Sequence, residues 1–172
     1  METQNAADSI IKGLELEMAF RPVGALTITS SIAYLNAEFD QYMASDFDGN
    51  PVDVSGNVMP VAPEWSANIT GQYVLKLADY GFITLRGEFG WQTETYFDQF
   101  ERDITKQGSY SIVNVLLSFE TADGRWRIDA HGRNLGDEEY YETLFPLGFV
   151  PEDVQGQTGT PRIYGLQVTY AF

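Results

Sequence analysis

The chain has 172 residues, no cysteine and a net charge of −15 at neutral pH. The lack of cysteine excludes disulfides and thiolate metal sites, and the acidic balance disfavours nucleic acid as a partner, because phosphate binding needs clustered Lys and Arg. No run approaches the roughly 18 apolar residues of a membrane-spanning helix. A membrane protein with this sequence would therefore have to be a closed β-barrel, which satisfies its backbone polar groups in lipid.

Residues 10–20 predict a first strand, because large apolar residues alternate with small or acidic ones, and side chains on a strand alternate between its two faces. A short turn over 21–25 leads to a second strand over 26–39 with the same alternation. Residues 40–63 are rich in Asp, Gly, Asn and Pro, which is typical of a loop.

Four more strands follow with the same period of two. They are predicted at 64–76, 82–97, 108–120 and 126–133. The connections between them are a turn at 78–81, a charged loop at 98–107 and a turn at 121–124. A last long loop occupies 135–160.

The last eleven residues predict a seventh strand that runs to the C-terminal Phe172. Its large apolar residues occupy every second position, namely Tyr164, Leu166, Val168, Tyr170 and Phe172. Ending a chain on an exposed aromatic gains little for a soluble protein, whereas a strand that closes a membrane barrel must carry its apolar face to the lipid boundary. We therefore expect an all-β fold, an antiparallel up-and-down transmembrane barrel segment of about seven strands.

The lengths of the connections support this expectation, since short and long ones alternate along the whole chain. Outer-membrane barrels place short turns on the periplasmic side and long loops outside. With Phe172 at the periplasmic side, every turn and loop of this chain is sorted in that way.

Aromatic residues then fall near both ends of the apolar faces, as in the interfacial girdles of such barrels: Tyr34, Trp65, Trp91 and Tyr164 outside, and Phe20, Phe119, Trp126, Tyr170 and Phe172 inside.

The faces opposite the apolar ones carry charges and amides, and in a membrane barrel such faces line a wet interior. The predicted lumen-facing residues are Glu15, Glu17, Arg86, Glu88, Gln92, Arg127, Asp129 and Arg133.

Two other interpretations stay open. One is a small self-contained outer-membrane barrel acting as an anchor or adhesin, and the other is a soluble calycin-like binding protein. An odd strand number and the lack of an export signal at residues 1–9 disfavour the small barrel.

Two stretches resemble the end of TonB-dependent outer-membrane receptors. Residues 132–141 (GRNLGDEEYY) resemble the family's Asn-Leu-x-Asp-x-x-Tyr segment, and residues 159–165 (GTPRIYG) with the final strand resemble its closing segment. Residues 13–17 and 63–68 resemble recurring strand openings of the family. The positions that carry the motifs are Asn134, Leu135, Asp137, Tyr140, Pro161, Arg162, Tyr164, Gly165 and Phe172.

The resemblance implies a part of a 22-stranded barrel with a plugged lumen, located in the bacterial outer membrane, which imports a scarce nutrient such as a ferric siderophore. The family's plug, its energy-coupling segment and its earlier strands precede the matching region. We therefore expect a fragment, with a disordered or partial-strand N-terminus at 1–9 and the C-terminal barrel portion at 10–172. The implied partners are outer-membrane lipid, the N-terminal barrel and plug, the TonB protein through the preceding segment, and a small-molecule substrate.

Other candidate sites have simpler explanations. Asp46, Asp48, Asn50 and Asp53 offer oxygen ligands for calcium, but the spacing of a calcium loop is not matched, and a turn-rich solvated loop is the favoured interpretation. His131, the only histidine, shares a face with Asp129, but no serine is marked as the nucleophile of a triad. We expect no enzymatic activity, no cofactor and no metal site.

Overall fold

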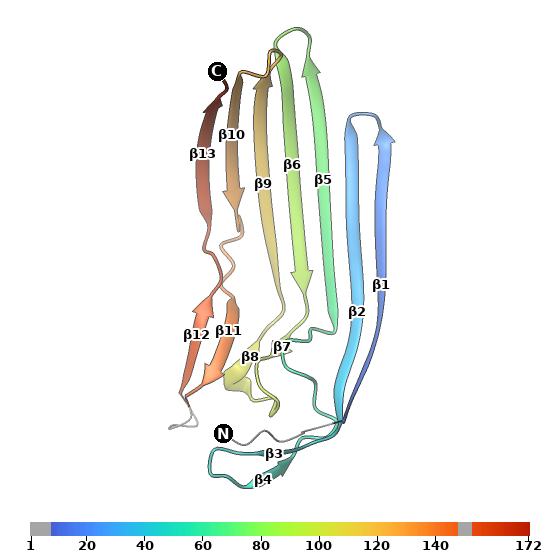
Figure 1. Cartoon of the computed structure of the whole chain (residues 1–172), viewed down its shortest axis with the longest axis vertical. Coiled ribbons are helices and arrows are strands. Elements are labelled where there is room, and N and C mark those ends of the chain that lie inside the picture. Colours follow the sequence, from blue (N-terminus) through green and yellow to red (C-terminus); the bar gives the residue numbers. More distant parts are fainter. Residues whose placement is uncertain (1–7, 148–152) are drawn as a thin grey trace.

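The computed structural model describes residues 8–147 and 153–172, and the protein is an open, single-layered antiparallel sheet (Figure 1). Seven long strands follow one another in the order β1-β2-β5-β6-β9-β10-β13, as the alternating sequence predicted. Their bounds are β1 Asp8–Val23, β2 Leu26–Gln41, β5 Trp65–Leu77, β6 Gly81–Gln92, β9 Tyr110–Thr121, β10 Trp126–Arg133 and β13 Ile163–Tyr170. Within the described ranges, no helix has the length and apolar character needed to span a membrane.

The two ends of the sheet differ, as predicted from the connection lengths. The turns β1–β2, β5–β6 and β9–β10 lie at one end together with the C-terminus, and all long connections lie at the other (Figure 1). The β5–β6–β9 pairing runs without a register shift, from Leu77↔Gly81 to Ser66↔Gln92 and from Gly81↔Thr121 to Gln92↔Tyr110. Side chains of neighbouring strands therefore fall into rows across the sheet. We refer below to the turn end and the loop end.

The long loops contain ordered elements that the sequence did not predict. The 40–63 loop holds a hairpin of β3, Met43–Ser45, and β4, Pro51–Asp53. The predicted fourth strand ends early, at Gln92, and residues 95–107 instead form β7, Thr95–Tyr96, the 3₁₀ turn η1, Asp103–Thr105, and β8, Lys106–Gln107. Within the 135–160 loop, β11, Tyr141–Pro146, pairs with β12, Val154–Thr158. Strands of two to six residues carry too few alternations to be recognised in a sequence.

The prediction that the last strand reaches Phe172 was wrong by two residues. β13 ends at Tyr170, because its partner β10 begins at Trp126, directly opposite. The backbone of Ala171 still donates a hydrogen bond to the carbonyl oxygen of Arg125. Phe172 is fully exposed and contacts Tyr170 edge-on at 5.1 Å between ring centroids.

The large apolar side chains of the sheet are exposed instead of forming an interior core. Leu14 is 74% exposed and Leu166 is 72% exposed. The only buried apolar side chains among the described residues are Ala37, Ala44, Val54 and Leu144, all towards the loop end. An exposed apolar surface of this extent is not stable in water, so the interpretation as a soluble calycin-like protein is wrong.

Aromatic pairs mark both ends of the apolar face. Tyr34 contacts Trp65 near the loop end, with ring centroids 4.9 Å apart. Trp126 contacts Tyr170 at the turn end, with ring centroids 4.6 Å apart. Both pairs join neighbouring strands and add to the cross-strand contacts that hold the register.

Candidate functional site

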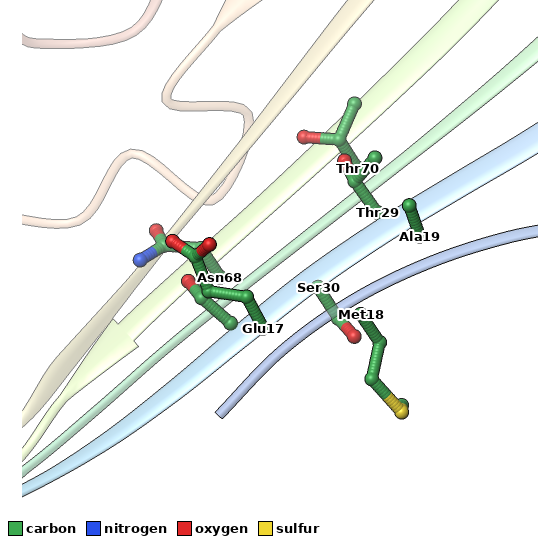
Figure 2. Close-up of a pocket in the computed structure, with 8 residues that line it drawn as sticks. Glu17, Met18, Ala19, Thr29, Ser30, Asn68 and Thr70 are labelled. Carbon is green, nitrogen blue, oxygen red and sulfur yellow. The ribbon is translucent and has the colours of Figure 1, made fainter. Parts of the chain in front are cut away.

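The polar face of the sheet has a hollow over its first strands. Glu17 of β1, Thr29 of β2, and Asn68 and Thr70 of β5 line a cavity of about 500 Å³. Figure 2 shows these side chains on one side of the sheet, while Met18 projects from the other. This alternation separates the polar and apolar faces as the period of two requires.

A second hollow lies on the same face over β6, β9 and β10. Its polar lining is Arg86, Glu88, Asn114, His131 and Arg133, and its volume is about 350 Å³. The Arg86 Nε donates to Glu88 Oε1 over 2.7 Å, and Asn114 Nδ2 donates to the other carboxylate oxygen over 3.4 Å. Glu88 thus has a partner on both of its oxygens.

Nearer the turn end, a third charged group spans two strands. Arg127 of β10 contacts both carboxylate oxygens of Asp129, each at 3.0 Å, and reaches Glu120 of β9 at 3.8 Å. The carboxylate of Asp129 is therefore paired with Arg127. The ring of His131 lies against Gly165, where an added Cβ would come within 2.4 Å of the ring.

All eight residues predicted to face the lumen therefore lie on one face of the sheet, in three groups. Glu15 and Glu17 lie on β1 at one edge, Arg86, Glu88 and Gln92 on β6 in the middle, and the remaining three on β10. The sequence did not single out Asn68 and Asn114, which line the same face beside Glu17 and Glu88. Asparagine is a common residue in turns, so its presence in the sequence did not mark Asn68 or Asn114 as a functional position.

The loop end of β10 is held by one buried side chain, Asn134, which is 2% exposed. Its amide nitrogen donates to the carbonyl oxygens of Glu138 at 2.9 Å and Thr160 at 3.0 Å. Its amide oxygen accepts from the backbone N–H of Glu138 at 2.9 Å. Asn134 has a φ of +47°, a conformation that Asn tolerates better than most residues. It thereby joins the end of β10 to the segment that enters β13.

The other motif positions complete this joint. The carboxylate of Asp137 accepts from the backbone N–H and from the guanidinium of Arg162, each at 3.1 Å. The ring of Tyr140 stacks on Tyr110 with centroids 4.5 Å apart and covers Gly159, where an added Cβ would come within 2.0 Å of the ring. Leu135 continues the ladder through its N–H to the carbonyl oxygen of Val113. These contacts order the chain between the two strands.

The remaining motif positions lie around β13. Tyr164 is 69% exposed on the apolar face, and its ring lies beside Gly132, where an added Cβ would come within 3.3 Å. Pro161, which has no N–H to donate, directly precedes Arg162 and the start of the strand.

A second buried cluster joins two long loops and was also missed. The carboxylate of Asp98 accepts hydrogen bonds from the N–H of Phe100, the guanidinium of Arg102 and the hydroxyl of Thr105, at 2.6 to 2.9 Å. The Arg102 guanidinium lies 4.9 Å from the ring centroid of Phe47 in the other loop. The partners come from separate stretches of chain, so the sequence alone does not bring them together.

The calcium candidates form a turn. The Asp46 carboxylate accepts from the N–H groups of Asp48 and Asn50 at 2.9 and 2.7 Å, and the Asn50 hydrogen bond holds the pKa of Asp46 below its ordinary value. A hydrogen bond from the Ser55 hydroxyl lowers the pKa of Asp53 in the same way. Across the described ranges, no three His, Cys, Asp or Glu side chains gather as a metal site would require.

Comparison with known proteins agrees with this geometry. The family model described as the TonB dependent receptor-like β-barrel matches residues 1–135. The chain belongs to this receptor-barrel family. It is accordingly a part of an outer-membrane protein, and its apolar face is the face that meets lipid.

Solved structures of receptors share the fold of this receptor-barrel chain. The ferric yersiniabactin uptake receptor FyuA from Yersinia pestis matches with a TM-score of 0.78 and 22% identity, over 98% of this chain and 24% of FyuA. The siderophore receptor PiuA from Acinetobacter baumannii matches with a TM-score of 0.78 and 19% identity, over 96% of this chain and 22% of PiuA. The chain thus spans about a quarter of the length of these receptors.

Proposed function

We propose that the chain forms the C-terminal part of the barrel wall in a receptor that takes up a scarce nutrient, such as a ferric siderophore, across the outer membrane. The observation that carries this proposal is a sheet with one apolar and one charged face, which belongs to the receptor-barrel family. Similar structures include a ferric yersiniabactin uptake receptor and a ferric preacinetobactin receptor. The role is that of a transport wall, and no enzymatic step is assigned to it.

The two edges of the sheet support a place within a larger barrel. Among the residues that the structure describes, β1 pairs with β2 alone, and β13 pairs with β10 alone. Unpaired backbone groups at lipid depth are costly, so each edge needs a further strand. We propose that strands from the rest of the receptor pair with β1 and β13 and close the barrel, as closure alone removes both edges.

The polar face then lines the interior. The predicted residues on this face are the charged Glu15, Glu17, Arg86, Glu88, Arg127, Asp129 and Arg133 and the amide Gln92. In the closed barrel these side chains face water, the plug or the solute on its way through. Energy for uptake would come from the TonB protein acting on a segment outside this part of the wall.

Uptake by cells tests the proposal. A strain lacking the gene that encodes this chain is compared with its parent for accumulation of ⁵⁵Fe from a panel of ferric siderophores under iron limitation. The proposal predicts that accumulation of one panel member falls to background and returns with the cloned gene. It also predicts that a protonophore stops this accumulation. Equal accumulation of every panel member in both strains would contradict it.

A further inference from the structure

Two long loops that are far apart in the sequence are fastened to each other. The first loop comprises residues 42–64 and contains β3 and β4, and the second comprises residues 93–109 and contains β7, η1 and β8. Both lie at the loop end of the sheet (Figure 1). Three hydrogen bonds join them, which we call the seam: Val58 N–H to Glu101 Oε1 at 2.6 Å, Asn57 Nδ2 to the Gln99 carbonyl oxygen at 2.9 Å, and Val61 N–H to the Tyr96 carbonyl oxygen at 2.8 Å.

The first loop is anchored to the sheet on the side that carries the seam. Backbone hydrogen bonds join Met59 N–H to the Ala37 carbonyl oxygen at 2.8 Å and Phe39 N–H to the Asn57 carbonyl oxygen at 3.0 Å. Val54 is 2% exposed, so the loop also has a small packed interior of its own. These contacts hold the first loop on β2 independently of the seam.

The second loop presents Glu101 to the first. The buried Asp98 carboxylate fixes the chain on both sides of Glu101, because it accepts hydrogen bonds from the N–H of Phe100 and from the guanidinium of Arg102. That guanidinium also lies over the ring of Phe47 in the first loop. Hydrogen bonds to a charged group are stronger than those between neutral groups, so the Glu101 carboxylate makes the strongest contact of the seam.

The backbone is strained on both sides of the seam. The φ angle is +59° at Val61 and +52° at Glu101, in the left-handed region that residues with a Cβ disfavour and β-branched residues disfavour most. Such strain persists only where neighbouring contacts hold it, and it is concentrated in segments that switch between conformations. Parting the seam removes the contacts that hold Val61 and Glu101 in this conformation, so the strain favours release.

We propose that the seam is a latch, in which the Glu101 carboxylate holds the second loop against the first while the backbone strain opposes it. When the latch opens, the first loop stays on β2 and the tip of the second loop, residues 97–105, moves away. The base of the second loop is retained by Gln107, whose side chain accepts the N–H of Tyr141 at 2.7 Å. Control of access to the outer mouth of the barrel by this latch rests on the proposed function, whereas the latch itself is a property of the two loops.

Distances between nitroxide labels in the complete receptor, reconstituted in vesicles, test the latch. The labels replace the exposed Asp48 and Asp103, one on each loop, in a receptor with no other cysteine. Double electron–electron resonance should show a short-distance population that predominates over a long-distance one. Glu101→Ala should raise the ratio of the long-distance to the short-distance population about tenfold, as for the loss of a hydrogen bond to a charged group.

A second variant acts on the strain and should have the opposite effect. Val61→Asn keeps the backbone N–H of the seam and places there a residue that tolerates a positive φ. It should lower the ratio below that of the parent, and it should also lower it when added to Glu101→Ala. The test therefore does not depend on the folding of Glu101→Ala.

The matched control is Glu94→Ala. Glu94 belongs to the same loop, but its carboxylate pairs with Lys106 of that loop at 2.8 Å, so its replacement should leave the ratio unchanged. A second pair of labels, at Asp48 and at the exposed Tyr73 of β5, reports the position of the first loop against the sheet. This distance should be the same in every variant.

Several results would overturn the latch. They are an unchanged ratio in Glu101→Ala, an equal rise in Glu94→Ala, and a rise caused by Val61→Asn. A broadened distance between Asp48 and Tyr73 in Glu101→Ala would mean that the first loop unfolds, and would overturn it as well. None of these results bears on the proposed function, because the ⁵⁵Fe accumulation panel tests uptake without reference to the loops.

Discussion

Replacing Asn134 by alanine should destabilise the barrel wall at its loop end. The side chain is 2% exposed and makes three hydrogen bonds, to the Glu138 carbonyl oxygen, the Glu138 N–H and the Thr160 carbonyl oxygen. Alanine leaves these backbone groups without their partner, and each such group costs about 1–3 kcal/mol when buried. Water that enters the space would recover a part of this loss.

The backbone adds a smaller cost. The φ of Asn134 is +47°, and a residue with a Cβ but no compensating polar group loses about 1 kcal/mol in that region. The sum for Asn134→Ala is about 4 kcal/mol in the free energy of unfolding, from about 1 kcal/mol for each of the three lost hydrogen bonds and about 1 kcal/mol of backbone strain. Asn134→Gly loses the same hydrogen bonds without the backbone strain, so it should be less destabilising than alanine by about 1 kcal/mol.

Urea unfolding of the receptor in lipid vesicles measures both variants. The fluorescence midpoint and slope give the change in unfolding free energy, and hydrogen exchange at Glu138 shows whether the joint has opened. A loss below about 1 kcal/mol for Asn134→Ala would refute the reasoning. So would a glycine variant that is less stable than the alanine variant, because the strain component would then have the wrong sign.

Three further predictions use matched positions. Leu85→Arg, on the apolar face at mid-strand, should lower the free energy of unfolding by about 2–4 kcal/mol, whereas Thr84→Arg on the polar face should lower it much less. Equal losses of stability in urea unfolding would contradict the assignment of the two faces. Gly165→Ala should destabilise by about 1–3 kcal/mol because its Cβ meets the His131 ring, while Gly87→Ala, where nothing lies within 4 Å, should be near neutral; His131→Ala should rescue the first variant. The pKa of Asp46 is lowered chiefly by the Asn50 hydrogen bond, so its contribution to the β3–β4 turn is present above pH of about 4 and is lost as the pH falls through the lowered value. The Asn50 amide shift should therefore titrate with a midpoint below about pH 4, and a midpoint above it would contradict the hydrogen bond.

The seven strands of the sheet could be predicted because a strand with lipid on one side and water on the other alternates apolar and polar residues with a period of two. Tyr164, Leu166 and Val168 alternate with smaller or more polar residues, and each falls on the face that the pairing with β10 exposes. In the structure the short turns set the register, as between Leu77 and Gly81. Local pattern and global arrangement agree here, so the sequence was sufficient.

The loop end could not be predicted, because its contacts join distant residues. Asn134 and Thr160 are 26 residues apart, and the N–H of Val58 donates to a carboxylate oxygen of Glu101, 43 residues away. The sequence identified Asn134 and Asp137 as motif positions, but not what they bind. Arg133 was predicted to face the lumen, but the sequence did not show that Glu88 beside it is hydrogen-bonded to Arg86 and to Asn114 of another strand.

A cysteine scan along β6 tests most directly whether the two faces meet different solvents. The chain has no native cysteine, so single cysteines at residues 82–89 can carry a nitroxide in the receptor reconstituted in vesicles. We predict that lipid-soluble oxygen relaxes labels at Ile83, Leu85 and Phe89, whereas a water-soluble nickel complex relaxes those at Thr84, Arg86 and Glu88. Accessibility without a period of two, or with the two sets exchanged, would contradict a barrel wall with lipid on one side and water on the other.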